Sequence, residues 1–472
     1  MELFCKSEKY LSVVGKIRKF LLSSEWMLLL FITAAVFTTV STIRPDSGAQ
    51  IIGTLVFAMI IGVCMVISDD ILAGLPPFMF AALIAIRCYD SFDIFMGYKW
   101  YALPLVICLL FHFIVYHGDW HFQGYLLKPS ICVSVAILTG GIGFITLKEY
   151  LAPTSLYHMA GLGFGMLFLY ELFYAHIKQR DYDIKDFIAK VMVASGCLAS
   201  FMVFSFYIIN INEFAETGEF LFMQWRNNCS TLLMIIIPFT FYMANRKAYA
   251  SVLGFIFFFA ILLTGSRGGM VFGAIEIVMC IFMYFLYDKR RRLAYIIICG
   301  CIALGLLVFS GKFITFLGST VDRLLTAING FLLGDKNEIR TIHFARGIND
   351  YLNNPIFGTG LGYMGNRDVF ASKDFALCWY HCAPIQVAAS FGTVGVIAFT
   401  YQFIKRNVLL WRRTSLFNIT VFLSYISLEM MSLVNPGVFC PLPYVLLITM
   451  FFVIVEKSNE QEEALEQKTL SE

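Results

Sequence analysis

The stretch VLGFIFFFAILLTGSRGGMVFGAIEIVMCIFMYFLY, residues 252–287, decides the fold: two apolar runs meet at a turn with one arginine and three glycines. Arg267 carries a permanent charge at the mouth of a membrane helix, which is an unusual place for a charge. The N-terminus of the second helix points its free backbone N–H groups at the same place. The turn at residues 263–269 therefore predicts an anion-binding site.

The rest of the chain has the composition of a membrane protein. Of its 472 residues, 59% are hydrophobic and only 14% are charged. Soluble domains of this size do not carry so little polar surface. We expect an all-α fold, a polytopic membrane protein with about 12–14 transmembrane helices and one long, partly helical outer loop. The expected spans lie near residues 26–44, 50–68, 71–88, 99–116, 129–147, 158–177, 188–209, 228–244, 250–264, 268–287, 293–310, 383–404, 415–434 and 440–456.

Charge predicts the orientation of these spans. Basic side chains lie between alternate spans, and they share one side of the membrane if the N-terminus is cytoplasmic, as the positive-inside rule requires. They are Lys6, Lys9, Lys16, Arg18, Lys19, Lys178, Arg180, Lys185, Arg246, Lys247, residues 289–292, Lys405, Arg406, Arg412 and Arg413. The predicted organisation is a cytoplasmic amphipathic segment (1–25), transmembrane helices 1–11 (26–310), an extracytoplasmic loop (311–378), transmembrane helices 12–14 (379–456) and a cytoplasmic acidic tail (457–472).

Two segments outside the spans have the apolar spacing of amphipathic helices. Leu11, Val14, Ile17 and Leu21 oppose the lysines near the N-terminus, which predicts a helix on the inner membrane surface. In the long loop, residues 340–352 predict a helix at the outer interface, with its apolar side chains at Ile342, Ala345, Ile348 and Leu352.

The end of the long loop carries a glycine-rich turn. Asn354 and Pro355 end the loop helix, and Gly358 and Gly360 follow in a flexible turn where backbone can approach a ligand closely. A nucleotide-binding loop is disfavoured, because no strand precedes these glycines. The aromatic pair at 379–380 suits the membrane interface, where the chain enters the next span.

The thirteen cysteines form no CxxC pair and no metal-type spacing, so no metal site is expected. Most lie inside apolar runs, where cysteine acts as a small hydrophobe. A disulfide between Cys378 and Cys382 is an alternative that the sequence leaves open.

Three motifs then carry a resemblance. Residues 262–269 look like a TGSRG signature, Arg340 followed by Pro355 and residues 358–362 looks like an R…NPxxGxGxG element, and His381 with Gln386 and Gly392 looks like an HNxxLQ…G element. In this order, they make the chain resemble the superfamily of O-antigen ligases and O-antigen (polysaccharide) polymerases, which are bacterial integral-membrane glycosyltransferases. Two positions depart from the pattern: Cys382 replaces an asparagine, and Ser390 replaces a frequent acidic residue.

The resemblance implies the reaction and its setting. The donor is a glycan on undecaprenyl diphosphate, and the acceptor is a hydroxyl of a glycan or a lipid-linked glycan at the outer leaflet. Neither a cofactor nor a metal is implied, and the expected partners are these substrates, membrane lipids and a chain-length regulator, with no nucleic acid. The expected location is the bacterial cytoplasmic membrane, with both termini cytoplasmic and the active site extracytoplasmic.

The residues and the resemblance together give candidate roles. Arg267 and Arg340 are the expected catalytic clamps on the diphosphate, since a guanidinium binds phosphate oxygens in pairs. His381 is expected to position or deprotonate the acceptor hydroxyl. Arg346 is the alternative to Arg340 for the second clamp. The two residues lie about 240° apart round the same helix, so both cannot face one ligand. Further candidates for substrate binding are Ser266, Gly268, Arg346, Gly358, Gly360 and Gln386.

Each role has a simpler alternative. Arg267 can snorkel to headgroups, Arg340 can bind lipid phosphate, and His381 can be an interfacial residue bonded to backbone. Three carboxylates, Glu171, Glu276 and Glu429, fall inside spans, where charge is costly. Glu276 is expected to be a structural partner between helices.

Within glycosyl transfer, the sequence favours a polymerase of surface polysaccharide (O-antigen or capsule), because the length and span count exceed the leaner ligase pattern. A ligase that moves the finished glycan to lipid A–core is the alternative. A flippase or exporter of the same lipid-linked glycan is a second alternative, although transporters tend to show internal repeats, which this sequence lacks.

Overall fold

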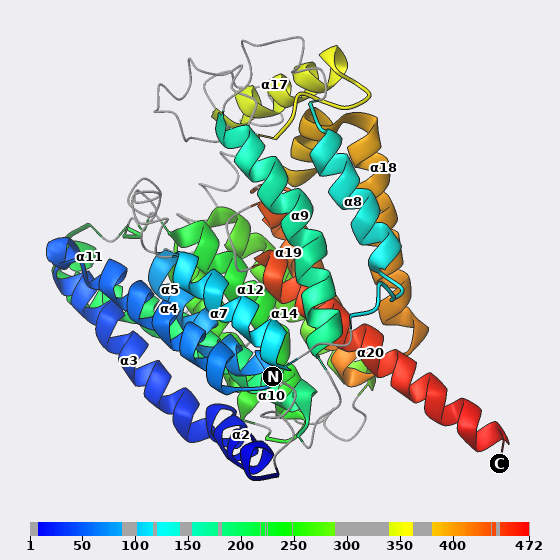
Figure 1. The fold of residues 1–472 in the computed structure, drawn as a ribbon. Helices are drawn as coiled ribbons and strands as arrows, with labels where there is room; N and C mark the ends of the chain where they lie inside the picture. Colours follow the sequence, from blue (N-terminus) through cyan, green and yellow to red (C-terminus); the bar gives the residue numbers. More distant parts are fainter. Residues whose placement is uncertain are drawn as a thin grey trace.

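The computed structural model describes residues 8–86, 102–116, 120–141, 153–177, 182–217, 219–221, 223, 225–247, 249–287, 339–361, 380–435, 437–439 and 444–471. All regular structure in these ranges is helical (Figure 1), which confirms the expected all-α fold. The helices are α2 (Glu8–Leu21), α3 (Ser24–Ile43), α4 (Ala49–Ile67), α5 (Leu75–Ile86), α7 (Ala102–Tyr116), α8 (Leu127–Thr139), α9 (Pro153–His176), α10 (Ile184–Ile209), α11 (Ile211–Thr217), α12 (Arg226–Ala244), α13 (Ala250–Leu263), α14 (Arg267–Tyr287), α17 (Ile339–Asn353), α18 (Ala383–Arg412), α19 (Leu416–Ser432) and α20 (Tyr444–Ser471), with short 3₁₀ turns η1 (Pro45–Ser47), η2 (Ile71–Gly74) and η8 (Gly437–Phe439).

Each expected span has a helix at its position, apart from 293–310, which lies outside the described residues together with residues 311–338 and 362–379 of the loop. Within the described ranges, six helices are long and apolar enough to cross a membrane: α3, α4, α10, α12, α14 and α18. Both predicted amphipathic helices are present, as α2 and α17.

Helix α12 lies at the centre of the main bundle and packs against α10, α13, α14 and α19. Its side chains from Leu232 to Ile237 are 0% exposed, so this helix is surrounded by protein rather than by lipid. That burial fits the sequence of residues 232–237, which is apolar all round rather than on one stripe.

A second layer stands beside this bundle. Helix α8 packs against α9 and against α18, and α20 joins the layer to α19 of the main bundle (Figure 1). Helix α17 lies across the end of the layer and packs on the first half of α18.

Four of the basic residues predicted to share one side of the membrane lie at one end of the molecule, which we call the basic end: Arg18, Arg246, Arg412 and Arg413. The side of the membrane that this end faces stays a prediction. Arg18 pairs with Asp69 (2.9 Å), and the adjacent Asp70 accepts a hydrogen bond from Tyr182. Arg246 pairs with Asp183 (2.7 Å), which follows Tyr182 directly.

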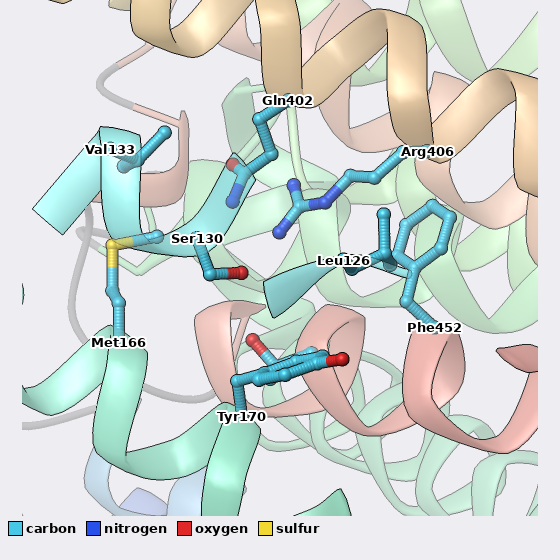
Figure 2. A pocket seen from close by; sticks show the side chains of 9 residues that line it. Leu126, Ser130, Val133, Met166, Tyr170, Gln402, Arg406 and Phe452 are labelled. Atoms are coloured by element: carbon cyan, nitrogen blue, oxygen red, sulfur yellow. The ribbon is translucent and has the colours of Figure 1, made fainter. Parts of the chain in front are cut away.

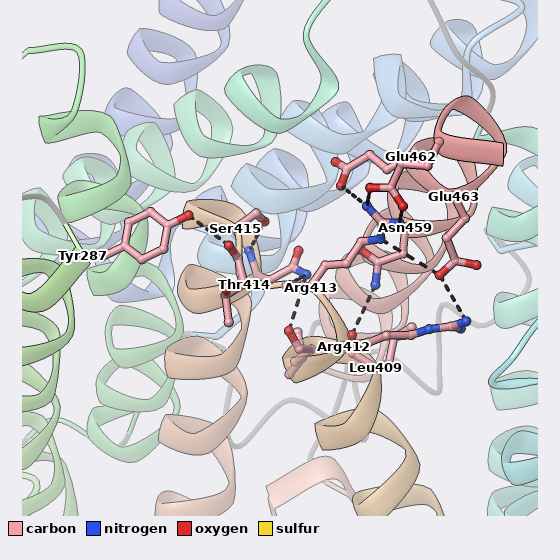
Figure 3. A network of polar contacts seen from close by, with 12 residues as sticks. Tyr287, Leu409, Arg412, Arg413, Thr414, Ser415, Asn459, Glu462 and Glu463 are labelled. Carbon is pink, nitrogen blue, oxygen red and sulfur yellow. Dashed lines mark hydrogen bonds and ion pairs between the residues drawn. The ribbon is translucent and has the colours of Figure 1, made fainter. Parts of the chain in front are cut away.

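The same end also holds the last turn of α18. Arg413 pairs with Glu466 (2.6 Å) and Arg412 with Glu463 (3.1 Å), so the acidic tail folds as helix against this turn (Figure 3). Tyr287, at the end of α14, donates to the carbonyl of Thr414 (2.9 Å). Since α14 ends here, its first residue, Arg267, lies at the opposite end, which we call the site end.

Candidate active site

The turn of residues 264–266 is held by its own hydroxyl groups at the site end. The Ser266 hydroxyl accepts from the N–H of Gly269 (3.3 Å) and donates to the side-chain oxygen of Asn227 (2.9 Å). Thr264 and Ser230 join their hydroxyls at 2.8 Å. These bonds fasten the start of α14 to the start of α12, so two helix N-termini lie side by side.

Arg267 is exposed at this position, and Gly268 beside it is closely packed. A Cβ built on Gly268 would lie 2.8 Å from Val434 of the turn after α19. Tyr444, at the start of α20, donates to the carbonyl of Asn228 (2.8 Å), which adds a third helix N-terminus. The positive ends of α12, α14 and α20 therefore gather near Arg267, an arrangement that favours an anion.

Helix α18 is broken at Gly392 (φ 62°, ψ −159°), and the turn of residues 354–361 repairs the break. An unbroken helix would use the next two N–H groups to bond its own carbonyls four residues back. The turn instead supplies two acceptors and two donors, which we call the four-bond exchange. Its bonds are Thr393 N–H to Pro355 O (2.8 Å), Val394 N–H to Ile356 O (3.2 Å), Thr359 N–H to Ala389 O (2.8 Å) and Gly360 N–H to Ser390 O (2.8 Å).

Glycine is required at both sides of this exchange. Gly358 has φ 64°, and a Cβ there would overlap the backbone at Ser390 and Phe391. A Cβ at Gly392 would overlap the carbonyl of Ile356. The close backbone approach seen at Gly358 is made to α18. The predicted approach of Gly358 and Gly360 to a ligand stays a prediction.

His381 sits on a backbone elbow at the start of α18. Its φ of 53° makes it the non-glycine residue with positive φ among the described residues, a conformation that costs about 1–3 kcal/mol. The preceding residue is fastened twice: the Tyr380 N–H donates to the Gln386 side chain (3.1 Å), and the Tyr380 hydroxyl donates to Asp350 of α17. Gln386 in turn donates to Ser390 (2.9 Å), so it supports the elbow from within α18.

Helix α17 turns a polar face toward this elbow. His343, Arg346 and Asp350 follow one another at helical spacing, and the His343 ring lies 5.4 Å from the His381 ring. Gly347, on the same face, lets the helix approach, since a Cβ there would lie 3.0 Å from the Tyr380 ring. The sequence analysis missed His343 and Asp350 because it followed the apolar spacing of this helix. Their spacing of seven residues was the signal available.

The charges on this face affect one another. Burial lowers the pKa of His343, and the nearby Arg346 charge lowers it further. Burial raises the pKa of Asp350, against the opposing effects of the Tyr380 hydroxyl and of Arg346. One guanidinium nitrogen of Arg346, Nη1, is buried and has no hydrogen-bond partner among the described residues. A buried, unpaired cationic donor is costly, so this nitrogen is ready for an anion.

The second clamp predicted from the resemblance, Arg340, lies in the first turn of α17, and its side chain lies outside what the structure describes. Of the two candidates for the second clamp, only Arg346 therefore has a side chain that the structure describes. That Arg267 binds the same ligand as Arg340 or Arg346 stays a prediction. The turn that carries Arg267 and the elbow at His381 both lie at the site end. The turn after α19 links them, because Val434 packs on Gly268 and Phe439 packs on Phe391 of α18 (5.9 Å).

A cavity of about 270 Å³ runs along α18 from Ala383, beside the elbow, to Arg406. Its walls come from α9, α18, α19, α20 and η8, and they include Val387, Phe399 and Ile448. A separate small pocket, which we call the small extension because Gln402 and Arg406 line both spaces, is also lined by Ser130 and Tyr170 (Figure 2). The cavity thus joins the candidate site to the interior of the helical layers.

Arg406 corrects one detail of the sequence analysis. It was assigned to the basic turn beyond a span ending at residue 404, whereas α18 continues to Arg412 and the Arg406 side chain is 8% exposed. Its guanidinium lies over the rings of Tyr425 (5.5 Å) and Phe452 (5.1 Å). Figure 2 shows it pointing into the small extension.

The three carboxylates expected inside spans differ in their surroundings. Glu429 lines the cavity. Glu276 is 1% exposed between helices and Glu171 is 4% exposed in α9, and both lie outside the clusters described above. Among the cysteines, Cys382 is a free, buried thiol, and Cys378 lies outside the described residues.

Comparison with known proteins identifies this region. Residues 252–400 match the family model described as O-antigen ligase, whereas no curated protein matches the chain. The matched region contains the Ser266–Arg267 turn, α17, the four-bond exchange and the His381 elbow. The comparison therefore supports the resemblance found in the motifs: residues 252–400 of this membrane protein are similar to the O-antigen ligase family.

Proposed function

We propose that this protein transfers a glycan from undecaprenyl diphosphate to a sugar hydroxyl at the outer leaflet of the bacterial cytoplasmic membrane. The observation that carries the proposal is the buried, unpartnered Nη1 of Arg346 on the helix face whose His343 meets His381. A cationic donor and a histidine at one elbow supply what the reaction needs, namely a group for the leaving diphosphate and a group for the acceptor.

In the proposed reaction, the acceptor hydroxyl oxygen forms a bond to the anomeric carbon of the donor. The bond from that carbon to the diphosphate oxygen breaks, and its electron pair leaves with the diphosphate. The hydroxyl proton passes to neutral His381 or to the departing phosphate. Negative charge grows on the diphosphate, so fixed cations beside it lower the barrier.

Arg346 and Arg267 are the proposed cations. Arg346 lies at the elbow, and Arg267 lies where the N-termini of α12, α14 and α20 gather. Ser266 and Gly268 would shape the second position, the first through its hydroxyl and the second by the close packing that holds α14 in place. Arg340 remains a candidate through the resemblance.

The cavity suits the lipid part of the donor. It begins beside the elbow at Ala383, and most of its wall is apolar, with Val387, Val396 and Phe399 on α18. Entry of a prenyl chain is favourable, since burial of each CH₂ group stabilises it by about 0.8 kcal/mol. Because the cavity begins beside the elbow, the diphosphate at the end of that chain would lie near His381.

Within this reaction class, we propose a polymerase of surface polysaccharide, on the length of the chain and the number of its helices. The ligase alternative has its own support, because the matching family model is described as O-antigen ligase. The two differ in the acceptor: a lipid-linked repeat unit for the polymerase, and lipid A–core for the ligase. A chain-length regulator is a proposed partner of the polymerase alone.

The test uses the full-length protein, purified in detergent, with undecaprenyl-diphosphate-linked repeat units from the source bacterium. Gel electrophoresis then reads the lengthening of the glycan. We expect lengthening by the unaltered protein, a loss of about 10²–10³-fold for Arg346→Ala, and a smaller loss for Arg346→Lys, which keeps the charge.

Arg413→Ala is the matched control, because this arginine pairs with Glu466 at the basic end and should leave the rate unchanged. Since detergent removes any membrane barrier, lengthening excludes a protein that only transports. Transfer to added lipid A–core without lengthening would assign the ligase. A full rate for Arg346→Ala would refute the proposed role of Arg346.

A further inference from the structure

We propose that His343 is a positioning residue that holds the His381 ring in its working orientation through ring-to-ring packing. The inference rests on the proposed function in one respect, the assignment of His381 to the acceptor hydroxyl. Nothing in the sequence motifs points to His343, which lies between the predicted clamps Arg340 and Arg346.

The first support is geometric. The His343 side chain is 0% exposed, and its ring meets the His381 ring at 5.4 Å with 59° between the planes. His381 itself is half-buried on a backbone elbow of positive φ. A side chain on such an elbow has few neighbours from its own segment, so the ring from α17 supplies the wall against which it rests.

The second support is the rigidity of the surroundings. Asp350, two turns beyond His343 on α17, accepts a hydrogen bond from the hydroxyl of Tyr380, which directly precedes His381. Gly347 lies between these contacts, and its lack of a side chain lets α17 reach the start of α18. The distance between α17 and the elbow is therefore set by the hydrogen bond from Tyr380 to Asp350 and by the close packing at Gly347, as a positioning residue requires.

The third support is the charge around the pair. The described titratable and charged groups that face it are Arg346 and Asp350 on α17 and Tyr380 beside the elbow. Burial and the Arg346 charge lower the pKa of His343, which disfavours a charged ring beside His381.

The test measures the chemical modification of His381 in the absence of substrate. The full-length protein in lipid nanodiscs is treated with diethylpyrocarbonate between pH 5 and 8, and peptide mass spectrometry gives the modification rate of His381 at each pH. Exposed His121 is the reference within the same sample. The variants are His343→Ala, which removes the ring, and His343→Phe, which keeps a ring without its nitrogens.

We expect the pH midpoint for His381 modification to rise by at least half a pH unit in His343→Ala and to stay near the unaltered value in His343→Phe. Glycan lengthening should fall through kcat rather than KM in the alanine variant, with partial rescue by phenylalanine. Equal midpoints in the unaltered protein and His343→Ala would overturn the inference, as would equal shifts in both variants.

One further readout separates the possible failures. Hydrogen exchange at Thr359 and Gly360 shows whether each variant still docks the loop, and a variant that loses this protection is replaced in the comparison by His343→Gln. The midpoint shift does not depend on transfer. A shift without any lengthening by the unaltered protein would refute the proposed function and leave the positioning role standing.

Discussion

Alanine at Gly392 should detach the loop from α18. The alanine Cβ would overlap the carbonyl of Ile356, so the variant has two ways to respond. It can keep the break, with a non-glycine residue at φ 62° and ψ −159°, or it can straighten the helix and release the turn of residues 354–361.

Both responses have a similar energy. Keeping the break costs about 1–3 kcal/mol of backbone strain, apart from the overlap. Straightening removes the four bonds of the exchange and restores two helical ones. The net loss of two, at about 0.5–1.5 kcal/mol each, is about 1–3 kcal/mol. A value near 2 kcal/mol shifts the ratio of docked to released turn by roughly 30-fold, since about 1.4 kcal/mol is tenfold.

The assay is hydrogen exchange read by mass spectrometry on the segments that contain Thr359, Gly360, Thr393 and Val394. We expect faster exchange in the first pair for Gly392→Ala, together with loss of glycan lengthening. Gly161→Ala is the control, because no atom lies within 4 Å of a Cβ built there. Unchanged exchange and unchanged lengthening in Gly392→Ala would refute the structural reasoning.

Three other perturbations test separate parts of the site. Arg267→Ala should lower the rate of glycan transfer by about 10²–10³-fold, and Arg267→Lys by less; a rate equal to that of the unaltered protein would remove Arg267 from the mechanism. Ser266→Ala removes the hydroxyl that caps α14, so thermal unfolding should show a loss of about 1 kcal/mol, and an unchanged melting temperature would contradict the capping role. Acid should destabilise the packing of α17. The pKa of His343 is lowered in the folded protein, so on acidification the unfolded form of this segment takes up the His343 proton before the folded form does. The stability of the folded form therefore falls as the pH drops below about 6.5. Hydrogen exchange of α17 at pH 7.5 and 5.5 measures this, and the dependence should vanish in His343→Phe; the raised pKa of Asp350 acts in the opposite direction, from 3.8 upward.

The positions of the helices could be predicted because the bilayer fixes their length. An apolar run bounded by charge must form a helix that satisfies its own backbone, and the expected spans therefore agree with the described helices. The end of α18 could not be placed in this way. Arg406 looks like the start of a basic turn, and only the packing of Tyr425 and Phe452 around its guanidinium shows that the helix continues.

The candidate site was partly predictable for a related reason. Periodicity gave α17, yet the apolar residues that define it are exposed, with Ile348 at 52% and Leu352 at 67%, while the polar face turns inward. A single sequence shows two faces and does not say which one meets protein. The role of Gly392 was also hidden, since its partners lie more than thirty residues earlier in the chain.

The break in α18 has a consequence for how the protein is made. Without the docked turn of residues 354–361, the break leaves two carbonyls and two N–H groups of α18 without partners, which hydrocarbon cannot satisfy. This turn is synthesised before α18, so it is already present when α18 enters the membrane. The half of α18 before Gly392 therefore reaches its final structure only together with the loop that precedes it.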